Sequence, residues 1–129
     1  MMQERKVGEI VTGIYKTGKY IGEITDVKPA HYLVKVKAVL NHPQQGDLHN
    51  PKQVDVQFFH ERRALAYQEQ TNIPKQMVKE YHDEVPVYAD SLKLALKTMK
   101  AKLEADATPW AQASLKKLAE LEKDYFPTL

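Results

Sequence analysis

Cysteine is missing from this sequence of 129 residues. Its absence excludes disulfide bonds, thiolate metal ligands, a cysteine nucleophile and a lipid attached through a cysteine side chain. Long apolar runs are missing too: no segment approaches the ~20 apolar residues of a membrane span, and residues 1–11 lack the apolar stretch of about 7 to 15 residues that a signal peptide needs. These absences predict a cytoplasmic protein.

An excess of one charge is also missing. Nineteen Lys and Arg residues oppose seventeen Asp and Glu residues, for a net charge of +2, and the two signs are interspersed along the chain. So small a net charge gives no reason to expect a nucleic acid or an anionic membrane surface as the partner. Apolar residues make up 43% of the sequence, which is enough for one compact core.

Alternation of apolar and polar residues, typical of half-buried β-strands, marks the first part of the chain. The predicted elements are strands at residues 7–15, 20–27, 31–40 and 64–69, a polar turn at residues 71–74 and a short closing strand at residues 77–81. Gly13 and Gly22 lie inside two of these strands, where glycine costs about 0.5–1 kcal/mol unless the backbone bends or approaches a neighbour closely. The element order and the curvature predict a mainly β fold, an SH3-like barrel.

From Tyr88 onwards the apolar period changes from two to about 3.6 residues, which predicts an amphipathic helix. Thr108 suits an N-cap and Pro109 the first position of a second helix, which Phe126 and Pro127 end. Because few residues separate the two helices, we expect an antiparallel helical hairpin. The predicted domains are the SH3-like barrel at residues 1–82, which includes a long loop at 41–63, and the C-terminal helical hairpin at residues 83–129, packed on the barrel.

The loop at residues 41–63 contains three of the five histidines. Imidazole and carboxylate groups form the ligand set of a metal site without thiolates. The spacings of seven and eleven residues between these histidines match no metal-binding pattern, so we predict no metal and no cofactor. The histidines are expected to hold the loop against the barrel through hydrogen bonds. The candidate partner-binding residues are His42, Asp47, His49, Phe58, His60, Glu61 and Arg62.

Several aromatic residues are candidates for peptide contact. Phe58 and Phe59 are adjacent, so on an extended backbone they point in opposite directions, one into the core and the other towards an interface. SH3-like surfaces bind extended segments across aromatic side chains. The tyrosines that invite this comparison are Tyr15, Tyr20 and Tyr32. Trp110 is expected to pack in the core.

Four segments carry a family resemblance: KTGKYIGEIT, HYLVKVKAVLNHPQQGDLHNP, DVQFFHERRALAYQEQTNIP and MVKEY. From residue 7 to residue 103 the chain resembles kinase-associated protein B, a small family of spore-forming Gram-positive bacteria. The resemblance implies an SH3-like barrel with a C-terminal helical part, and a role as an accessory activator of a sporulation histidine kinase that feeds the phosphorelay. It implies no catalytic residues. Some members are described as lipoproteins, but this sequence offers no cysteine to acylate, so contact with a membrane would come through a partner.

We therefore predict a non-enzymatic regulator that binds a sensor histidine kinase through the loop at residues 41–63 and shifts its active population. No serine, cysteine or lysine nucleophile sits in a recognisable motif beside His60 and Glu61. Two alternatives stay open. One is a metal-dependent hydrolase that uses His42, Asp47, His49 and His60. The other is a small nucleic-acid-binding barrel with Lys35 and Lys37 on one face. The sequence does not define an oligomeric state.

Overall fold

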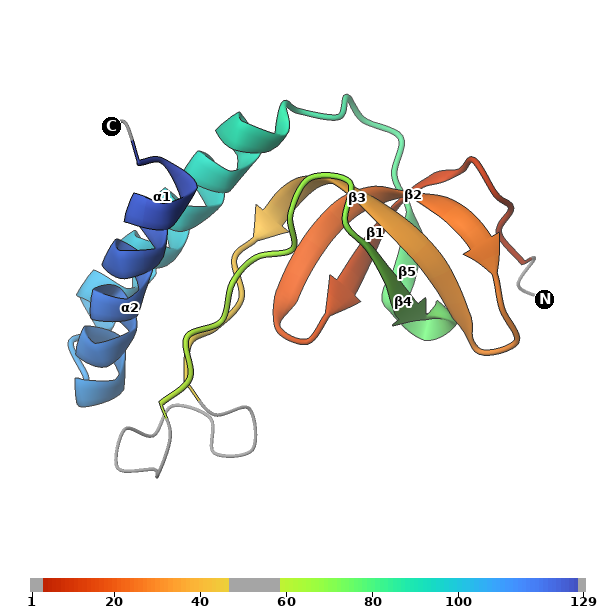
Figure 1. The fold of residues 1–129 in the computed structure, drawn as a ribbon. Helices are drawn as coiled ribbons and strands as arrows, with labels where there is room; N and C mark the ends of the chain where they lie inside the picture. Colours follow the sequence, from red (N-terminus) through yellow and green to blue (C-terminus); the bar gives the residue numbers. More distant parts are fainter. Residues whose placement is uncertain (1–3, 47–58, 128–129) are drawn as a thin grey trace.

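The computed structural model describes residues 4–46 and 59–127 (Figure 1). A curved antiparallel sheet is followed by two C-terminal helices, as predicted. In chain order the elements are β1 (Ile10–Tyr15), β2 (Gly18–Val27), β3 (His31–Asn41), β4 (Gln70–Pro74), the 3-10 helix η1 (Lys75–Met77), β5 (Val78–Glu80), α1 (Tyr88–Asp106) and α2 (Pro109–Tyr125). The prediction of a mainly β fold with a helical hairpin is confirmed.

The five strands are ordered β4-β3-β2-β1-β5 in the sheet. Three register shifts interrupt the pairing of β2 with β3, and such bulges bend a sheet. The curved sheet encloses a small core to which every strand contributes. This inner core consists of Val11, Ile24, Tyr32, Val34, Ile73 and Val78. The SH3-like barrel is not closed: within the described residues, β4 and β5 stand at the two edges of the sheet and do not pair with each other.

The fourth strand lies later in the chain than predicted. Residues 64–69 are not a strand, and residues 71–74, expected to be a polar turn, belong to β4. At the start of the segment 64–69, the backbone N–H groups donate to side chains. The N–H of Ala64 donates to the Tyr125 hydroxyl at 2.9 Å, and the N–H of Leu65 donates to the Tyr20 hydroxyl at 3.2 Å. Side-chain oxygens thus accept the N–H groups at the start of the segment, and only Gln68 and Glu69 at its end bond to the backbone of Val36 in β3. The predicted closing strand is confirmed as β5.

Gly22 shows why a glycine stands inside a strand. A Cβ atom at this position would lie 2.5 Å from Cγ1 of Val34 and 2.6 Å from the carbonyl oxygen of Lys35. The backbone of β2 therefore approaches β3 more closely than any other residue would permit, which confirms the prediction that a strand glycine marks close approach.

We expect Gly22→Ala to lower the free energy of unfolding by about 1–3 kcal/mol, because the methyl group has no space and the contacting carbonyl cannot move without disturbing β3. Urea unfolding followed by circular dichroism measures the change. Lys19→Ala, in the same strand and at a half-buried position, is the control. A Gly22→Ala variant as stable as this control would contradict the steric argument.

The start of α1 and both ends of α2 lie where the sequence predicts, whereas α1 extends to Asp106, into the segment expected to connect the helices. The Thr108 side chain caps α2 by accepting a hydrogen bond from the N–H of Ala111 at 3.1 Å, and Pro109 takes the first helical position. Ala107 adopts φ 59°, the left-handed conformation that ends α1 and reverses the chain. Figure 1 shows α1 and α2 side by side as an antiparallel hairpin beside the sheet.

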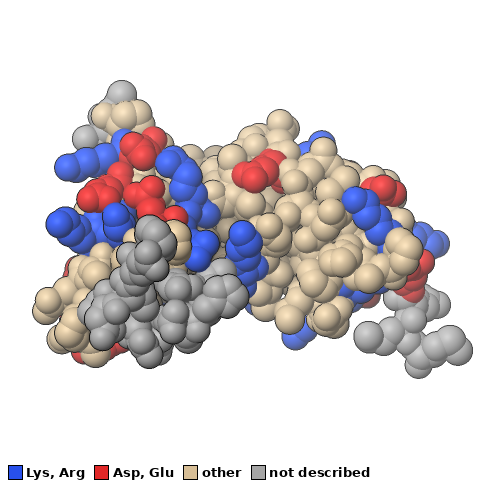
Figure 2. All heavy atoms as spheres, turned by 60° about the horizontal axis from the view of Figure 1, so that its bottom comes forward, with Lys and Arg blue, Asp and Glu red and all other residues tan. Residues whose placement is uncertain are grey.

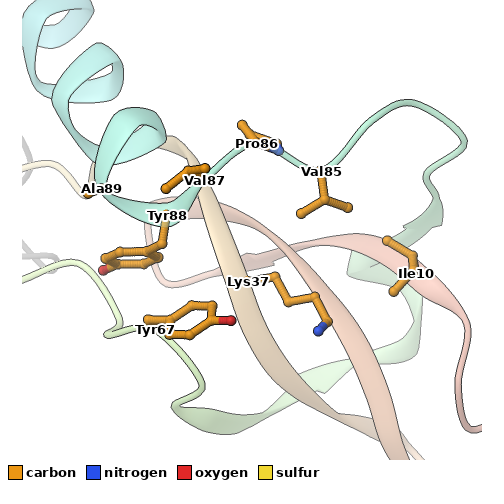
Figure 3. A pocket seen from close by; sticks show the side chains of 8 residues that line it. All are labelled: Ile10, Lys37, Tyr67, Val85, Pro86, Val87, Tyr88 and Ala89. Carbon is orange, nitrogen blue, oxygen red and sulfur yellow. The ribbon is translucent and has the colours of Figure 1, made fainter.

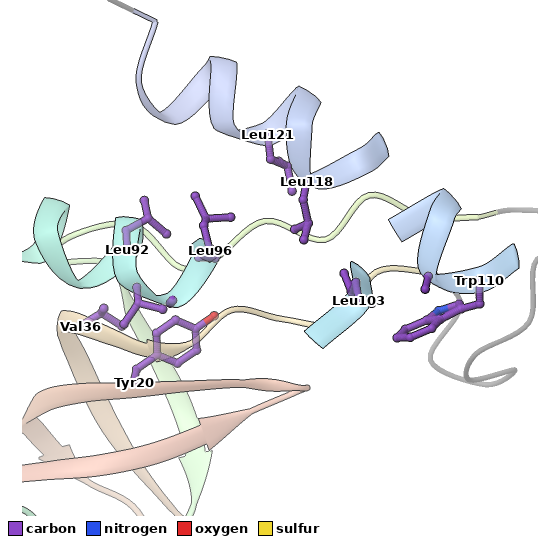
Figure 4. Packing of buried hydrophobic residues seen from close by; sticks show 12 residues of the cluster. Tyr20, Val36, Leu92, Leu96, Leu103, Trp110, Leu118 and Leu121 are labelled. Atoms are coloured by element: carbon purple, nitrogen blue, oxygen red, sulfur yellow. The ribbon is translucent and has the colours of Figure 1, made fainter. Parts of the chain in front are cut away.

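A second core joins the hairpin to the sheet (Figure 4). Tyr20 and Val36 from the sheet pack with Leu96 from α1 and with Leu118 and Leu121 from α2, and each side chain is at most 1% exposed. Trp110 belongs to the same cluster and is buried, so the prediction that it packs is confirmed. Because this outer core draws on both parts of the chain, the hairpin contributes to the stability of the sheet.

Candidate functional site

The two described ends of the long loop lie side by side, between the helical hairpin and the sheet in the view of Figure 1. We call residues 41–46 and 59–65 the loop stem. The Gln45 side chain joins the two halves of the stem through two hydrogen bonds. Its oxygen accepts the N–H of Arg62 at 2.9 Å, and its nitrogen donates to the Arg62 carbonyl, also at 2.9 Å. The N–H of Gly46 donates to the carbonyl of His60 at 2.9 Å. The stem is therefore a fixed support for the loop that it carries.

The C-terminal end of α2 anchors this stem through Tyr125. The Tyr125 hydroxyl accepts the N–H of Ala64 and lies 3.0 Å from Nε2 of His42. Nδ1 of His42 lies 3.0 Å from the carbonyl oxygen of Pro43. A carbonyl can only accept, so Nδ1 carries the proton and Nε2 accepts from the Tyr125 O–H. At the other end of α2, Nε1 of Trp110 donates to the carbonyl of Gln45 at 3.3 Å.

His42 is consequently a structural residue. Its side chain is 1% exposed, and burial lowers the pKa of its imidazole to about 4, so the ring is neutral near pH 7. The 1% exposure of His42 disfavours the predicted partner contact at this residue. The loop histidines were expected to hold the loop against the barrel, whereas His42 ties the loop stem to α2.

Three of the other predicted contact residues lie in the described stem. His60 and Glu61 are exposed and Arg62 is half-buried. Glu61 and Arg62 line a polar depression of about 310 Å³, together with residues from β1 and the turn that follows it. The predicted contacts Asp47, His49 and Phe58 lie outside the described residues. Phe59 packs against the outer core, which leaves Phe58 as the predicted interface member of the pair.

Two of the three tyrosines that invited comparison with a peptide-binding surface are buried, whereas Tyr15 is half-buried. Tyr20 and Tyr32 are 1% and 4% exposed, and both serve the cores. An aromatic pair that the sequence analysis missed lies elsewhere: the rings of Tyr67 and Tyr88 are 5.8 Å apart, and Tyr67 is 54% exposed. The sequence analysis did not select Tyr67, because its segment was predicted to be a strand.

This pair lies in an open apolar groove of about 760 Å³ between the sheet and the segment that leads into α1 (Figure 3). We call it the linker groove. It is lined by Ile10, Lys37, Tyr67, Val85, Pro86, Val87, Tyr88 and Ala89. Val87 is 66% exposed and Tyr67 is 54% exposed, so the groove presents apolar surface to solvent. The apolar run Val85-Pro86-Val87 was the available signal, but the sequence analysis did not select it.

Charges on the surface are mixed. On the face drawn in Figure 2, Lys and Arg side chains intermingle with Asp and Glu side chains, above all on the helical hairpin. Among residues 4–46 and 59–127, no group of three or more His, Cys, Asp or Glu side chains could hold a metal ion. The helices in the described part of the chain are too short or too polar to cross a membrane.

The fold and these surfaces define a class: a small, mainly β protein with a C-terminal helical hairpin, whose described surface features are the exposed stem residues His60 and Glu61 and an apolar groove. Within that class, the chain belongs to the family described as Kinase associated protein B, whose sequence model matches residues 15–126. This family assignment confirms the resemblance noted from the sequence.

Two relatives support the assignment. The "Kinase-associated lipoprotein B" of Bacillus subtilis (strain 168) is 63% identical over 125 residues, which cover 97% of this chain and 98% of the relative. The crystal structure of kinase-associated protein B from Bacillus cereus superimposes with a TM-score of 0.81 at 52% identity, covering 95% of this chain and 98% of that one. The printed name of the first relative includes "lipoprotein", whereas the present sequence contains no cysteine.

Proposed function

We propose that this protein is a non-enzymatic accessory protein that binds a sensor histidine kinase and raises its activity, and so feeds the sporulation phosphorelay. The observation that carries the proposal is family membership across residues 15–126, together with a 63% identical relative whose name states kinase association. The protein acts in the cytoplasm and reaches the membrane only through the kinase.

The loop is the proposed contact surface. Its stem is fixed by Gln45 and Tyr125, so the exposed His60 and Glu61 are held in place without the entropy cost of ordering a free chain. Preorganisation of this kind favours binding. To activate the kinase, the loop must contact its active state better than its inactive state, because only a difference in affinity shifts the two populations.

Co-purification with the cytoplasmic domain of the kinase tests the proposal. We expect the double variant His60→Ala/Glu61→Ala to bind about tenfold more weakly, because it removes exposed polar contacts without opening the core. Glu104→Ala, an exposed carboxylate on α1, is the matched control and should bind like the wild type. Thermal unfolding must show that all three proteins are equally folded.

Two results would contradict the proposal. If the wild type does not bind the kinase domain, the function fails. If the double variant binds as well as Glu104→Ala, the kinase remains the partner but His60 and Glu61 are not part of the contact.

Neither alternative function gains support from the described residues. For a metal-dependent hydrolase, His42 would need a free ring nitrogen, yet both nitrogens already have partners. For a nucleic-acid-binding surface, a strong excess of positive charge would be needed, yet the net charge is only +2 and cations intermingle with carboxylates on the face drawn in Figure 2.

A further inference from the structure

The linker groove does not end at α1. A second apolar depression of about 240 Å³ begins at Tyr88 and Ala89, which line both hollows. It continues between the loop stem and the helices to Tyr125 and Phe126. Because Tyr88 and Ala89 line both hollows, the two adjoin at the start of α1, and we call the pair of adjoining hollows the path. A compact small molecule would fill only one of them, whereas a stretch of polypeptide can follow the whole path.

The charges along this path have one sign. Each hollow has one charged lining residue, Lys37 in the linker groove and Arg63 in the second depression, and no carboxylate is among the described residues that line either one. Lys37 and Arg63 pair with Glu23 at 3.6 Å and Asp124 at 3.3 Å. An ammonium group has three N–H donors and a guanidinium group five, so each cation keeps donors for a further acceptor.

We propose that this path binds a segment of a protein partner that is apolar along its length and carries carboxylates that face Lys37 and Arg63. The apolar walls, with Val87 at 66% and Tyr67 at 54% exposure, supply the surface to be buried. The two cations select the charge of the occupant. The inference rests on the proposed function only in that the partner is a protein. The surface that it assigns does not include the exposed residues His60 and Glu61 of the proposed kinase contact.

Val87 is a position at which a charge can be added to the groove without disturbing the fold. It is the N-cap of α1, with an extended backbone (φ −62°, ψ 134°), and a valine side chain cannot accept a hydrogen bond from the first helical turn. Asp and Thr are both favourable N-cap residues. Val87→Asp therefore adds a negative charge to the groove while favouring the fold, and Val87→Thr is a neutral control of nearly the same shape. Neither variant should lower the midpoint of thermal unfolding.

The probe is a library of randomised peptides, selected for binding to the full-length wild-type protein. We expect the selected peptides to combine apolar residues with Asp or Glu. A synthetic peptide of the consensus sequence should bind Val87→Asp about tenfold more weakly than the wild type, and Val87→Thr should stay close to the wild type. Replacing the carboxylates of the peptide by amides should weaken its binding to the wild type in the same way.

Several outcomes would overturn the inference: enrichment of basic or uncharged peptides, no enrichment at all, or equal affinity for Val87→Asp and Val87→Thr. Self-association of the wild type that Val87→Asp abolishes would show that a second copy occupies the groove instead. The kinase assay separates this inference from the proposed function. If Val87→Asp binds the kinase domain as the wild type does, while His60→Ala/Glu61→Ala does not, the groove is not the kinase contact and the function stands.

Discussion

Replacing Leu118 by alanine is expected to lower the free energy of unfolding by about 2–5 kcal/mol. Leu118 is 0% exposed, and Figure 4 shows its side chain pointing from α2 into the outer core. The change removes buried apolar atoms and leaves a cavity that the rigid neighbours cannot fill. Since a small domain has only about 5–15 kcal/mol of stability, this single substitution brings the protein close to unfolding at 37 °C.

The control is the same substitution on the surface. Leu94 lies in α1 and is 65% exposed, so Leu94→Ala should change the free energy of unfolding by no more than about 0.5 kcal/mol. Urea unfolding of both variants should be followed by helical circular dichroism and by the fluorescence of Trp110. Equal stability of the two variants would contradict the assignment of Leu118 to the core.

The same experiment addresses the predicted domain division at residue 82. The outer core shares Tyr20 and Val36 of the sheet with Leu118 of α2, so we expect sheet and hairpin to unfold together in one transition. If Leu118→Ala instead melts the helices at a lower urea concentration while the signals of the sheet tyrosines persist, then the hairpin is a separately folding unit.

Local signals were enough to predict most elements of the fold. The alternation along β3 depends only on neighbouring residues, and so do the cap of α2 by Thr108 and the proline that follows it. The fourth strand was misplaced because its competitor, residues 64–69, is stabilised from far away. The hydroxyls that accept the backbone N–H groups of Ala64 and Leu65 lie 61 and 45 residues distant in the sequence. No local pattern contains that information.

The candidate site shows the same limit of local reasoning. His42 looks like an exposed loop histidine until the fold brings Tyr125, 83 residues later, to its Nε2 atom. The linker groove likewise depends on the fold to bring Ile10, Tyr67 and Val87 to one surface. The sequence identified the loop as the distinctive segment of the chain, but it could not separate the residues that support the loop from those that face outward.

Acidification is expected to destabilise this protein through His42. Burial lowers the pKa of the imidazole from 6.5 to about 4 in the folded protein, whereas the unfolded chain keeps a pKa near 6.5. Between these values the unfolded state binds more protons, so the contribution of His42 to stability is fully present above pH 6.5 and is lost as the pH falls towards 4. The linkage relation gives a loss of about 2 kcal/mol between pH 7 and pH 5.

His42→Gln isolates this effect, because glutamine can still accept a hydrogen bond from Tyr125 but does not titrate. The variant should be less stable than the wild type at pH 7, and the stability difference between the two proteins should shrink by about 2 kcal/mol on going to pH 5. Urea unfolding at each pH measures that difference, in which the exposed histidines His60 and His82 cancel. A difference that stays constant from pH 7 to pH 5 would mean that the imidazole titrates alike in both states, and that the contact between the loop stem and α2 accommodates a charged ring.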